Sequence, residues 1–334
     1  MNSKLLIEVA KKVVSRTILA ADESTGTIKK RLATIGIEST PEINRQYRQL
    51  LFTAKGIEKY VSGVILYDET IRQSTDSNIP FPKLLIKKGI VPGIKVDKGT
   101  INLPTLGVDK FTQGLDKLTD RLQEYKQLGA QFAKWRAVYT IDESSPSDTV
   151  LEKNAHDLAV YAILCQEADI VPIVEPEVLM DGEHSLEKDK RVTAKVLSIV
   201  FKKLKEYGVY FPGMILKPNM VTSGKNHSQQ ASVEKVAEIT LKVLKKTVPS
   251  SVLGVAFLSG GQSPDLATTH LDKINKIRNK NKSSYPWRLT ASYGRALQGE
   301  ALEAWSGKKQ NVQKAQKVFI TRAEKVYKAS IGML

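Results

Sequence analysis

Apolar and polar positions along the chain follow two alternating patterns. The first is a short, nearly continuous apolar stretch rich in β-branched residues, which occurs at residues 17–21, 61–66, 90–94, 131–135, 170–174, 213–216, 253–258 and 287–291. Stretches of this length are typical of strands in a parallel sheet that is buried on both faces. We therefore expect eight parallel strands, one from each stretch.

The second pattern has helical periodicity and lies between these stretches. One helix is expected after Thr40, a suitable N-cap, and Pro41, a residue favoured at the first helical position. Its apolar stripe comprises Ile43, Tyr47, Leu50, Leu51 and Ala54. Similar stripes occur at residues 192–204 and 233–244. Strands that alternate with amphipathic helices indicate right-handed βαβ units.

Two α/β folds fit this alternation, an open doubly wound sheet and a closed barrel. An open sheet usually has fewer strands and places a G-x-G-x-x-G turn after the first one, whereas residues 22–26 read DESTG here. We therefore predict an α/β fold of the (β/α)8 TIM-barrel class. A single domain is expected over residues 1–334, with an N-terminal helical extension and a C-terminal helix.

Net charge adds a constraint on partners. Lysine and arginine exceed aspartate and glutamate by 51 to 35, which gives a formal charge of +16. This excess favours phosphorylated metabolites, nucleic acid or a membrane surface, and charge alone does not decide among them. No stretch approaches the roughly 20 apolar residues of a spanning helix, so we expect a cytoplasmic protein.

Cysteine and histidine argue against a metal site. Cys165, the single cysteine, follows an apolar helix-like run and is expected to be buried and not a nucleophile. The four histidines are scattered, with no pair at i, i+2 or i, i+4, and we expect them on the surface or in loops: His156, His184, His227 and His270. No metal and no other cofactor is therefore predicted.

Polar residues gather where the predicted strands end. They are Asp22, Asp68, Lys95, Asp97, Lys134, Arg136, Glu175, Glu177, Lys217, Asn219, Ser259 and Ser292. Several form i, i+2 pairs, which share one face of a strand. Charges at the ends of buried strands are costly unless a ligand or a partner satisfies them. The sequence therefore predicts a binding or catalytic site at the C-terminal rim of the barrel.

Two roles are open for Lys217 at this rim. A lysine acts as a nucleophile only as its neutral amine, which desolvation and a neighbouring cation favour. Lys134 can approach Lys217 across the barrel, and Glu175 is placed to shuttle protons. Lys217 could equally clamp a phosphate, and spacing does not separate the two roles.

Two glycine-containing turns indicate phosphate binding. Residues 258–262 (LSGGQ) follow the seventh predicted strand, and residues 292–295 (SYGR) follow the eighth. Exposed backbone N–H groups at such turns bind anions, and barrels commonly bind a phosphate with these two loops.

Eight collinear motifs resemble class I fructose-1,6-bisphosphate aldolases over nearly the whole chain. They are LAADESTG (19–26), LYDET (66–70), PGIKVDKG (92–99), AKWR (133–136), PIVEPE (172–177), LKPNMV (216–221), LSGGQ (258–262) and SYGRAL (292–297). The resemblance implies a barrel enzyme that cleaves fructose 1,6-bisphosphate through a lysine Schiff base and needs no metal. A homo-oligomer, commonly a tetramer, is also implied.

The resemblance also implies a role for each matching residue. Lys217 corresponds to the Schiff-base lysine and Glu175 to the general acid and base, with Glu177 beside it. Asp22 corresponds to the residue that takes the C4 hydroxyl proton, and Lys134 to the cation that tunes Lys217 and Glu175. Phosphate-binding residues form two further sets. The C1 phosphate is expected at Ser259, Gly260, Gly261, Gly294 and Arg295, and the distal phosphate and sugar hydroxyls at Lys95, Arg136, Ser24 and Arg31.

The chain departs from the family in two places. Animal members have a mobile tail that ends in a tyrosine and assists proton transfer at the enamine, whereas this chain ends at Leu334 and has its last tyrosine at Tyr327. Proton exchange at the enamine is therefore expected to be slower or to use another group. Thr27 stands where many relatives have a serine. A tail this short is compatible with a bacterial or other microbial member.

Two other functions compete with this interpretation. A deoxyribose-phosphate aldolase or a transaldolase also forms a Schiff base, but it needs only one phosphate site, and the second basic set around Arg31 and Lys95 argues against it. A nucleic-acid- or polyanion-binding protein would fit the charge. The lysine-rich run 308–328 has an apolar stripe typical of a packed helix, however, and no aromatic stacking platform is apparent. Polyanion binding is retained as a side activity.

Overall fold

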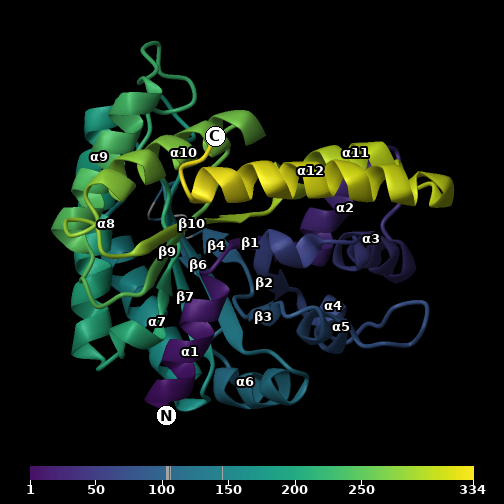
Figure 1. The fold of residues 1–334 in the computed structure, drawn as a ribbon. Helices are drawn as coiled ribbons and strands as arrows, with labels where there is room; N and C mark the ends of the chain where they lie inside the picture. Colours follow the sequence, from purple (N-terminus) through teal and green to yellow (C-terminus); the bar gives the residue numbers. More distant parts are fainter. Residues whose placement is uncertain (103–104, 106, 145) are drawn as a thin grey trace.

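Eight parallel strands close into a barrel within the part of the chain that the computed structural model describes, which is every residue except 103, 104, 106 and 145 (Figure 1). The strands follow one another around the barrel as β1 (Thr17–Ala21), β2 (Val61–Leu66), β3 (Val91–Lys95), β6 (Phe132–Tyr139), β7 (Val171–Val178), β8 (Ile215–Leu216), β9 (Gly254–Phe257) and β10 (Arg288–Tyr293). The predicted (β/α)8 fold is confirmed.

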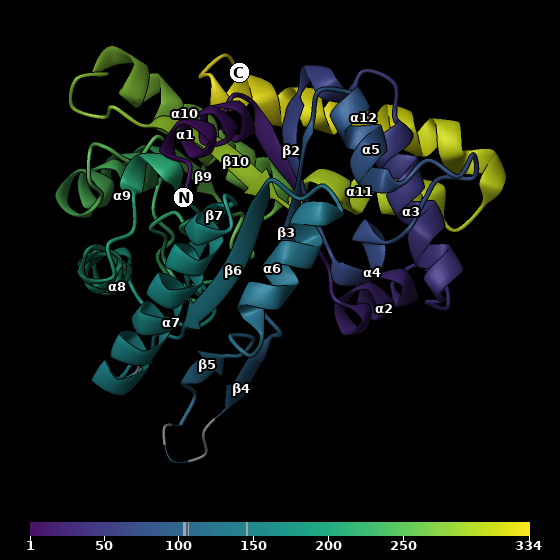
Figure 2. The same ribbon diagram turned by 90° about the horizontal axis from the view of Figure 1, so that it is seen from below.

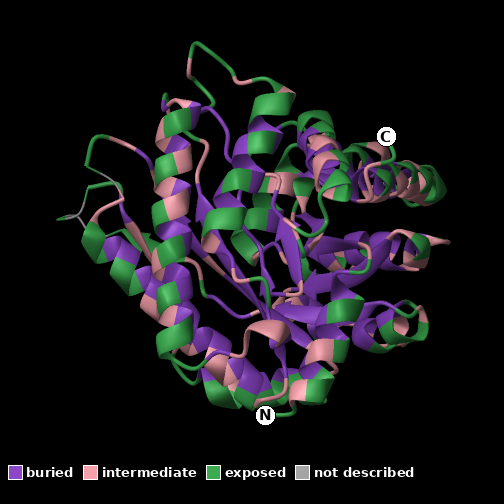
Figure 3. Cartoon of the chain, turned by 60° about the vertical axis from the view of Figure 1, so that its left-hand side comes forward, coloured by how far each residue is buried: buried purple, intermediate pink, exposed green. Residues whose placement is uncertain are grey.

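Helices connect successive strands and cover the outside of the barrel. They are α2 (Thr25–Ala33), α3 (Pro41–Thr53), α4 (Asp68–Ile71), α5 (Phe81–Lys87), α6 (Leu118–Gln127), α7 (Asp148–Glu167), α8 (Leu186–Glu206), α9 (Val233–Thr247), α10 (Pro264–Lys280) and α11 (Arg295–Trp305). The start of α3 is as predicted, because the Thr40 hydroxyl accepts the Ile43 N–H and Pro41 is the first helical residue. Figure 3 shows the buried strands at the centre and the exposed outer faces of the helices.

The N-terminal end of the barrel is closed by apolar packing. Helix α1 (Ser3–Val13) lies across this end, and Val14 packs so closely on Gly254 that a Cβ there would lie 2.5 Å from the valine side chain. The Phe132 ring similarly fills the space over Gly93, where a Cβ would lie 2.3 Å from it. Because side chains fill this end, polar chemistry is confined to the opposite, C-terminal end.

The chain ends in a long helix that packs outside the barrel. Helix α12 (Val312–Ser330) runs across α3, α10 and α11 (Figure 1), and Phe319 and Val326 on its inner face are fully buried. This confirms the packed amphipathic helix expected for the lysine-rich run. Cys165 in α7 is also fully buried, as predicted. Among the described residues, no helix is both long and apolar enough to cross a membrane.

The sequence misplaced several strand boundaries. It ended the fourth and fifth strands near residues 135 and 174, but β6 and β7 continue to Tyr139 and Val178. Lys134 and Arg136 therefore lie within β6 and do not mark its end. Their side chains face the polar upper part of the barrel interior, so the strand continues past them. The sixth strand is shorter than predicted: Gly213 belongs to a 3₁₀ turn, Phe211–Gly213.

An antiparallel hairpin was not predicted. Strands β4 (Thr100–Asn102) and β5 (Lys110–Thr112) pair between β3 and α6, and Figure 2 shows them projecting beside α6 and α7. Each strand has three residues, and all three residues of β4 are exposed, so neither strand has the apolar pattern that identifies a strand. The side chain of Asn154 in α7 anchors the hairpin by donating to the Lys110 carbonyl.

Candidate active site

The residues that the family resemblance assigned to catalysis or phosphate binding all line one cavity of about 270 Å³ at the C-terminal end of the barrel. They are Asp22, Ser24, Arg31, Lys95, Lys134, Arg136, Glu175, Glu177, Lys217, Ser259, Gly260, Gly261, Gly294 and Arg295. Ser292, predicted at the rim, also lines this cavity, as do four residues without a predicted role: Ala20, Glu23, Thr27 and Leu258. Of the other predicted rim residues, Asp68 and Asp97 line a neighbouring cavity, and Asn219 lines neither. Residues from the ends of several strands therefore converge on one space, as the spacing predicted.

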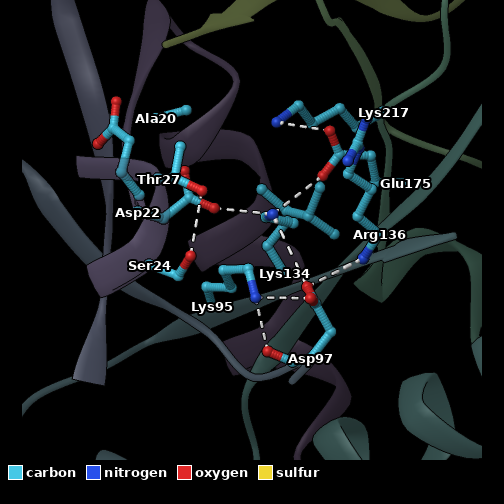
Figure 4. Close-up of polar contacts among 12 residues, drawn as sticks. Ala20, Asp22, Ser24, Thr27, Lys95, Asp97, Lys134, Arg136, Glu175 and Lys217 are labelled. Atoms are coloured by element: carbon cyan, nitrogen blue, oxygen red, sulfur yellow. Dashed lines mark hydrogen bonds and ion pairs between the residues drawn. The ribbon is translucent and has the colours of Figure 1, made fainter. Parts of the chain in front are cut away.

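Glu175 lies between two lysines at the centre of the cavity (Figure 4). Its Oε1 is 3.0 Å from Lys217 Nζ, and its Oε2 is 3.3 Å from Lys134 Nζ. The side chains of all three residues are about 95% buried. A carboxylate in contact with a buried lysine amine can take a proton from it and return one to a bound oxygen.

Asp22 forms the other half of the cluster, because its Oδ2 is 2.7 Å from Lys134 Nζ. Burial alone would raise the pKa of Asp22, but the charges of Lys134 and Lys217 outweigh it and hold this pKa well below its ordinary range. Burial would lower the pKa of Lys134, but Asp22, Glu175 and Asp97 together raise it far above its ordinary value. Asp22 is therefore an anion and Lys134 a permanent cation at neutral pH.

A second group of charges extends the cluster along β3 and β6. Lys95 Nζ donates to Asp97 Oδ1 at 2.5 Å and to the Asp97 carbonyl at 2.6 Å. Arg136 Nε donates to Glu177 Oε2 at 2.5 Å. Lys95 and Arg136 also line a neighbouring cavity of about 490 Å³, so they stand where the two cavities meet. A ligand that is longer than the first cavity would contact both cations.

The loop after β9 is shaped to bind an anion. Gly260 and Gly261 both have positive φ angles, 58° and 81°, which residues with a Cβ rarely adopt. The two glycines form a turn, and the backbone N–H groups of such a turn can bind an anion. Helix α11 begins nearby at Arg295, and its N-cap, Gly294, has no side chain to satisfy the first N–H groups. Those groups are available to a phosphate.

Helix α2, which follows β1, also has an N-terminus at the cavity that no side chain caps. Helix α2 has Ser24 as its N-cap, but the Ser24 hydroxyl makes no capping bond and instead lies 3.1 Å from the Thr27 hydroxyl. By contrast, the N-caps of α8 and α9, Ser185 and Ser232, both accept a backbone N–H. The helix ends that line the cavity therefore retain free donors, which suits an anionic ligand at each end of the site.

Comparison with known proteins agrees with this geometry. The family model for class-I fructose-bisphosphate aldolase matches residues 5–334. This chain belongs to the class I fructose-bisphosphate aldolase family.

Members of the family from distant organisms are similar to the chain. A probable fructose-bisphosphate aldolase class 1 from Xanthomonas campestris pv. campestris is 48% identical over 99% of both chains. Fructose-bisphosphate aldolase 4, cytosolic, from Arabidopsis thaliana is 48% identical over 94% of this chain and 79% of its own length.

A solved aldolase structure extends the agreement to the fold. The structure of fructose-bisphosphate aldolase from Plasmodium falciparum, in complex with TRAP and a small molecule inhibitor, superposes with a TM-score of 0.96 at 47% identity. The alignment covers 99% of this chain and 95% of that one.

One charged residue of the cavity was missed by the sequence analysis. Glu23 is buried beside Asp22, and its two carboxylate oxygens contact Arg31 and Arg48, the latter at 2.6 Å. Gln298 in α11 also donates to Glu23, at 2.8 Å. Burial lowers the pKa of Arg31 to about 10, which leaves it charged at neutral pH. Glu23 therefore holds a cation at the cavity wall, and only the fold reveals this, because Arg48 and Gln298 are remote in sequence.

Glu23→Gln is expected to lower the free energy of unfolding by about 3–5 kcal/mol, because it leaves the buried Arg48 guanidinium without its counter-charge. The matched control is Glu42→Gln, which removes an exposed pair with Arg45 and should cost at most about 1 kcal/mol. Urea unfolding of both variants measures the difference. Equal losses would show that the buried pair is no stronger than a surface pair.

The histidines required a correction. His270 was expected on the surface or in a loop, but it is buried within α10, and its Nδ1 lies 2.6 Å from Gln262 Oε1. Burial lowers the pKa of His270 to about 4. The side chain fills the space between α10 and the loop after β9, which a sequence pattern does not reveal. Among the described residues, no group of histidine, cysteine, aspartate and glutamate side chains could hold a metal ion.

Tyr327 lies far from the active-site cavity. Its ring packs 6.0 Å from that of Tyr60, which immediately precedes β2. Strands enter the barrel at the end opposite the active site, so Tyr327 is at the wrong end to act on a bound sugar.

Proposed function

We propose that this aldolase cleaves fructose 1,6-bisphosphate reversibly through a Schiff base on Lys217. The observation that supports it most directly is the position of Glu175, whose carboxylate contacts Lys217 at 3.0 Å and Lys134 at 3.3 Å. A lysine that only clamped a phosphate would need no proton acceptor of this kind. A buried amine with a carboxylate and a second ammonium beside it has the arrangement that imine formation requires.

Imine formation is assigned to Lys217 and Glu175. Glu175 first takes a proton from the Lys217 ammonium. The neutral amine then attacks the C2 carbonyl carbon of the sugar, and one of the amine protons passes to the new C2 oxygen. Glu175 returns its proton to that oxygen, water leaves, and the iminium forms with Glu175 again a carboxylate. Lys134 holds the carboxylate of Glu175 in place through their 3.3 Å contact.

Carbon–carbon cleavage is assigned to Asp22. Its carboxylate takes the proton of the C4 hydroxyl, the C4 oxygen forms a carbonyl, and the electrons of the C3–C4 bond move into the iminium. Glyceraldehyde 3-phosphate leaves, and an enamine remains on Lys217. Protonation of the enamine at C3 and addition of water release dihydroxyacetone phosphate and restore the amine.

The two phosphates are assigned to opposite ends of the cavity. The C1 phosphate is proposed to bind Ser259, Gly260, Gly261 and the start of α11 at Gly294 and Arg295. The distal phosphate and the sugar hydroxyls are proposed to bind Lys95, Arg136, Ser24 and Arg31, of which Lys95, Arg136 and Ser24 also line the second cavity.

Lys95→Met is expected to raise KM for fructose 1,6-bisphosphate about 10-fold or more, because it removes a charge-assisted contact to the distal phosphate. Fructose 1-phosphate lacks the distal phosphate. If its C1 phosphate binds the residues proposed for that group, its KM should change less than about 2-fold. Cleavage of each sugar is measured with a coupled assay in the presence of EDTA. Equal increases for both sugars would remove Lys95 from the distal site, and loss of activity with EDTA would contradict the metal-independent route.

A polyanion-binding side activity is proposed on the outside of the barrel. A groove of about 410 Å³ between α8 and α9 is lined by Lys190, Arg191, Lys195, Lys242 and Lys246. Among the described residues, Arg191, Lys242 and Lys246 form no ion pair with a carboxylate, so the groove keeps a net positive charge. Such a surface attracts phosphate backbones without selecting a sequence.

The double variant Lys242→Glu/Lys246→Glu is expected to weaken binding of a duplex DNA probe at least about 10-fold at low salt. Filter binding from low to high salt should show a smaller slope for the variant, because fewer counterions are released. Lys317→Glu/Lys325→Glu in α12 is the charge-matched control. Native-like binding by the groove variant would show that the net charge, and not this groove, attracts the probe.

Assembly and location are proposals that rest on the family. We propose that the chain forms a homo-oligomer, with a tetramer as the expected state, and that it acts in the cytoplasm, as the name of the cytosolic relative from Arabidopsis thaliana suggests. Sedimentation equilibrium at micromolar concentration measures the mass, and a mass of about one chain, 37.0 kDa, would contradict the tetramer.

A further inference from the structure

Lys217 leaves the shortest strand of the barrel. Strand β8 has two residues, Ile215 and Leu216, and Lys217 follows directly. Two backbone hydrogen bonds hold the next residues to the neighbouring strands: Lys217 N–H donates to the Val174 carbonyl at 2.8 Å, and Leu258 N–H donates to the Pro218 carbonyl at 3.1 Å. From Asn219 onward the chain has left the barrel, so other contacts must fix its path beyond the nucleophile.

A hydrogen-bonded series of buried side chains provides those contacts. Asn219 Oδ1 accepts the N–H of Val178, the last residue of β7, at 3.1 Å. Asn219 Nδ2 donates to Thr193 Oγ1 at 3.1 Å, and the Thr193 hydroxyl donates to Asp189 Oδ1 at 2.6 Å. Asp189 Oδ2 accepts the N–H of Thr222 at 2.8 Å. The three residues whose side chains take part, Asn219, Thr193 and Asp189, are at most 5% exposed.

This arrangement connects the elements that carry the catalytic groups. Asp189 and Thr193 lie one turn apart on the inner face of α8. Through them, α8 holds two points of the segment after Lys217, at Asn219 and at Thr222. Asn219 in turn holds the end of β7, the strand that bears Glu175. The separation of Lys217 and Glu175 is therefore tied to one hydrogen-bonded unit.

The unit contains a carboxyl group that is costly to bury. Among the described residues, Asp189 has no lysine or arginine partner, and burial raises its pKa to about 7, although the bonds from Thr193 and Thr222 oppose this shift. An apolar residue at this position would pack without that cost. What the carboxylate provides is two acceptor oxygens at fixed positions, one for the Thr193 hydroxyl and one for the Thr222 N–H.

We infer that Asp189 and Thr193 are positioning residues, which hold Lys217 at the distance from Glu175 that imine formation needs. This inference rests on the proposed role of Lys217 as the Schiff-base lysine. Neither residue lines the active-site cavity, so both act through Asn219 and the backbone beyond Lys217. Loss of the unit would let the β8 exit shift relative to β7 and would slow the step that needs this distance.

The experiment compares Thr193→Val, which keeps the shape and removes the hydroxyl, with Thr193→Ser, which keeps the hydroxyl. The rate of adduct formation with dihydroxyacetone phosphate is measured by rapid borohydride quenching, together with kcat and KM for fructose 1,6-bisphosphate. Thr193→Val is expected to lower the adduct rate and kcat about 10- to 100-fold, because small misplacements of reacting groups cost this much. KM should change less than about 3-fold, and Thr193→Ser should restore most of kcat.

Thr268→Val is the matched control. Thr268 is a fully buried threonine in α10 whose hydroxyl donates to the Pro264 carbonyl of its own helix. Loss of the Thr268 hydroxyl should leave kcat within about 2-fold of the native value. A folded Thr193→Val variant with native kcat and native adduct rate would overturn the inference. If the native protein itself gave no adduct on Lys217, the proposed function would fail instead, so the two failures are distinguishable.

Asp189→Asn provides a second test that does not depend on how Thr193→Val folds. An asparagine presents one acceptor and one donor, so either the Thr193 hydroxyl or the Thr222 N–H loses its partner, and kcat should again fall at least about 10-fold. The stability of Asp189→Asn relative to the native protein should rise with pH, although its kcat falls. Because the folded pKa of Asp189 lies above its unfolded value, the folded state loses stability as pH rises from about 4 to about 7.

The stability readout is the difference in Tm between Asp189→Asn and the native protein at pH 4.5 and pH 8.5. This difference should increase with pH, because the variant cannot acquire the buried charge. A variant that shows the increase and keeps native kcat would mean that Asp189 has no positioning role. A variant that loses kcat without the increase would support the positioning role, because the hydrogen bonds of Asp189 and not its charge would then hold the unit together.

Discussion

Lys217→Met is expected to abolish the covalent adduct with dihydroxyacetone phosphate and to lower kcat by at least about 10⁴-fold, because no other group replaces a missing nucleophile. The Lys217 side chain is 4% exposed, and methionine has a similar length and no charge. Glu175 keeps its contact with Lys134 in the variant, so its carboxylate is not left unpaired. The fold should therefore survive the substitution, and the loss should be chemical.

Borohydride trapping followed by intact mass and peptide mapping measures this result. The native protein should acquire one adduct on Lys217, also with EDTA present, and the variant none. Lys88→Met, which removes a half-buried lysine far from the cavity, should trap as the native protein does. An adduct that mapped to Lys134 or Lys95 would show that the nucleophile is misassigned and that Lys217 clamps a phosphate.

The strand positions could be predicted because each strand is apolar enough to be recognised without its neighbours. Prediction was weakest where a strand carries charge: β6 and β7 continue beyond Lys134 and Glu175 because the upper barrel interior is polar. A rule that ends strands at charged residues is therefore least reliable at an active site. The β4–β5 hairpin was missed for a different reason, since its strands are short and mostly exposed.

The site residues that could be predicted are those that lie in a recognisable sequence motif or at the end of an apolar strand. Asp22 and Lys134 come from different strands, yet both were placed at the rim by their position after or within an apolar run. Glu23 was missed because its partners, Arg31, Arg48 and Gln298, come from α2, α3 and α11, and packing alone brings them together. Asp189 was missed because a charged residue in an amphipathic helix normally faces solvent.

Asp22→Asn is expected to separate imine formation from carbon–carbon cleavage. The amide keeps the size of the side chain but cannot take the C4 hydroxyl proton, so kcat for cleavage should fall about 10²- to 10⁴-fold. Trapping of dihydroxyacetone phosphate, which has no C3–C4 bond to cleave, should stay near the native level. Lys134 loses one anionic partner in the variant, but it keeps Glu175 at 3.3 Å and Asp97 at 3.8 Å.

The decisive measurement is the mass of the adduct that forms with fructose 1,6-bisphosphate. In the variant, borohydride should trap the uncleaved sugar on Lys217, because the iminium accumulates before the blocked step. Asp157→Asn, a buried aspartate paired with Lys153 away from the cavity, should trap as the native protein does. If Asp22→Asn trapped neither sugar, Asp22 would be needed for imine formation, and the proton acceptor for cleavage would have to be another group.

The pH dependence of the native enzyme adds an independent check on Asp22. Because Lys134 and Lys217 hold the pKa of Asp22 well below its ordinary range, the carboxylate is ionised throughout pH 5–9. The acid limb of kcat in that range should therefore belong to another group, and Asp22→Asn should lower kcat by the same factor at every pH. A factor that shrank toward pH 5 would mean that Asp22 itself takes up a proton there. Lys134 would then be a weaker counter-charge than its 2.7 Å contact indicates.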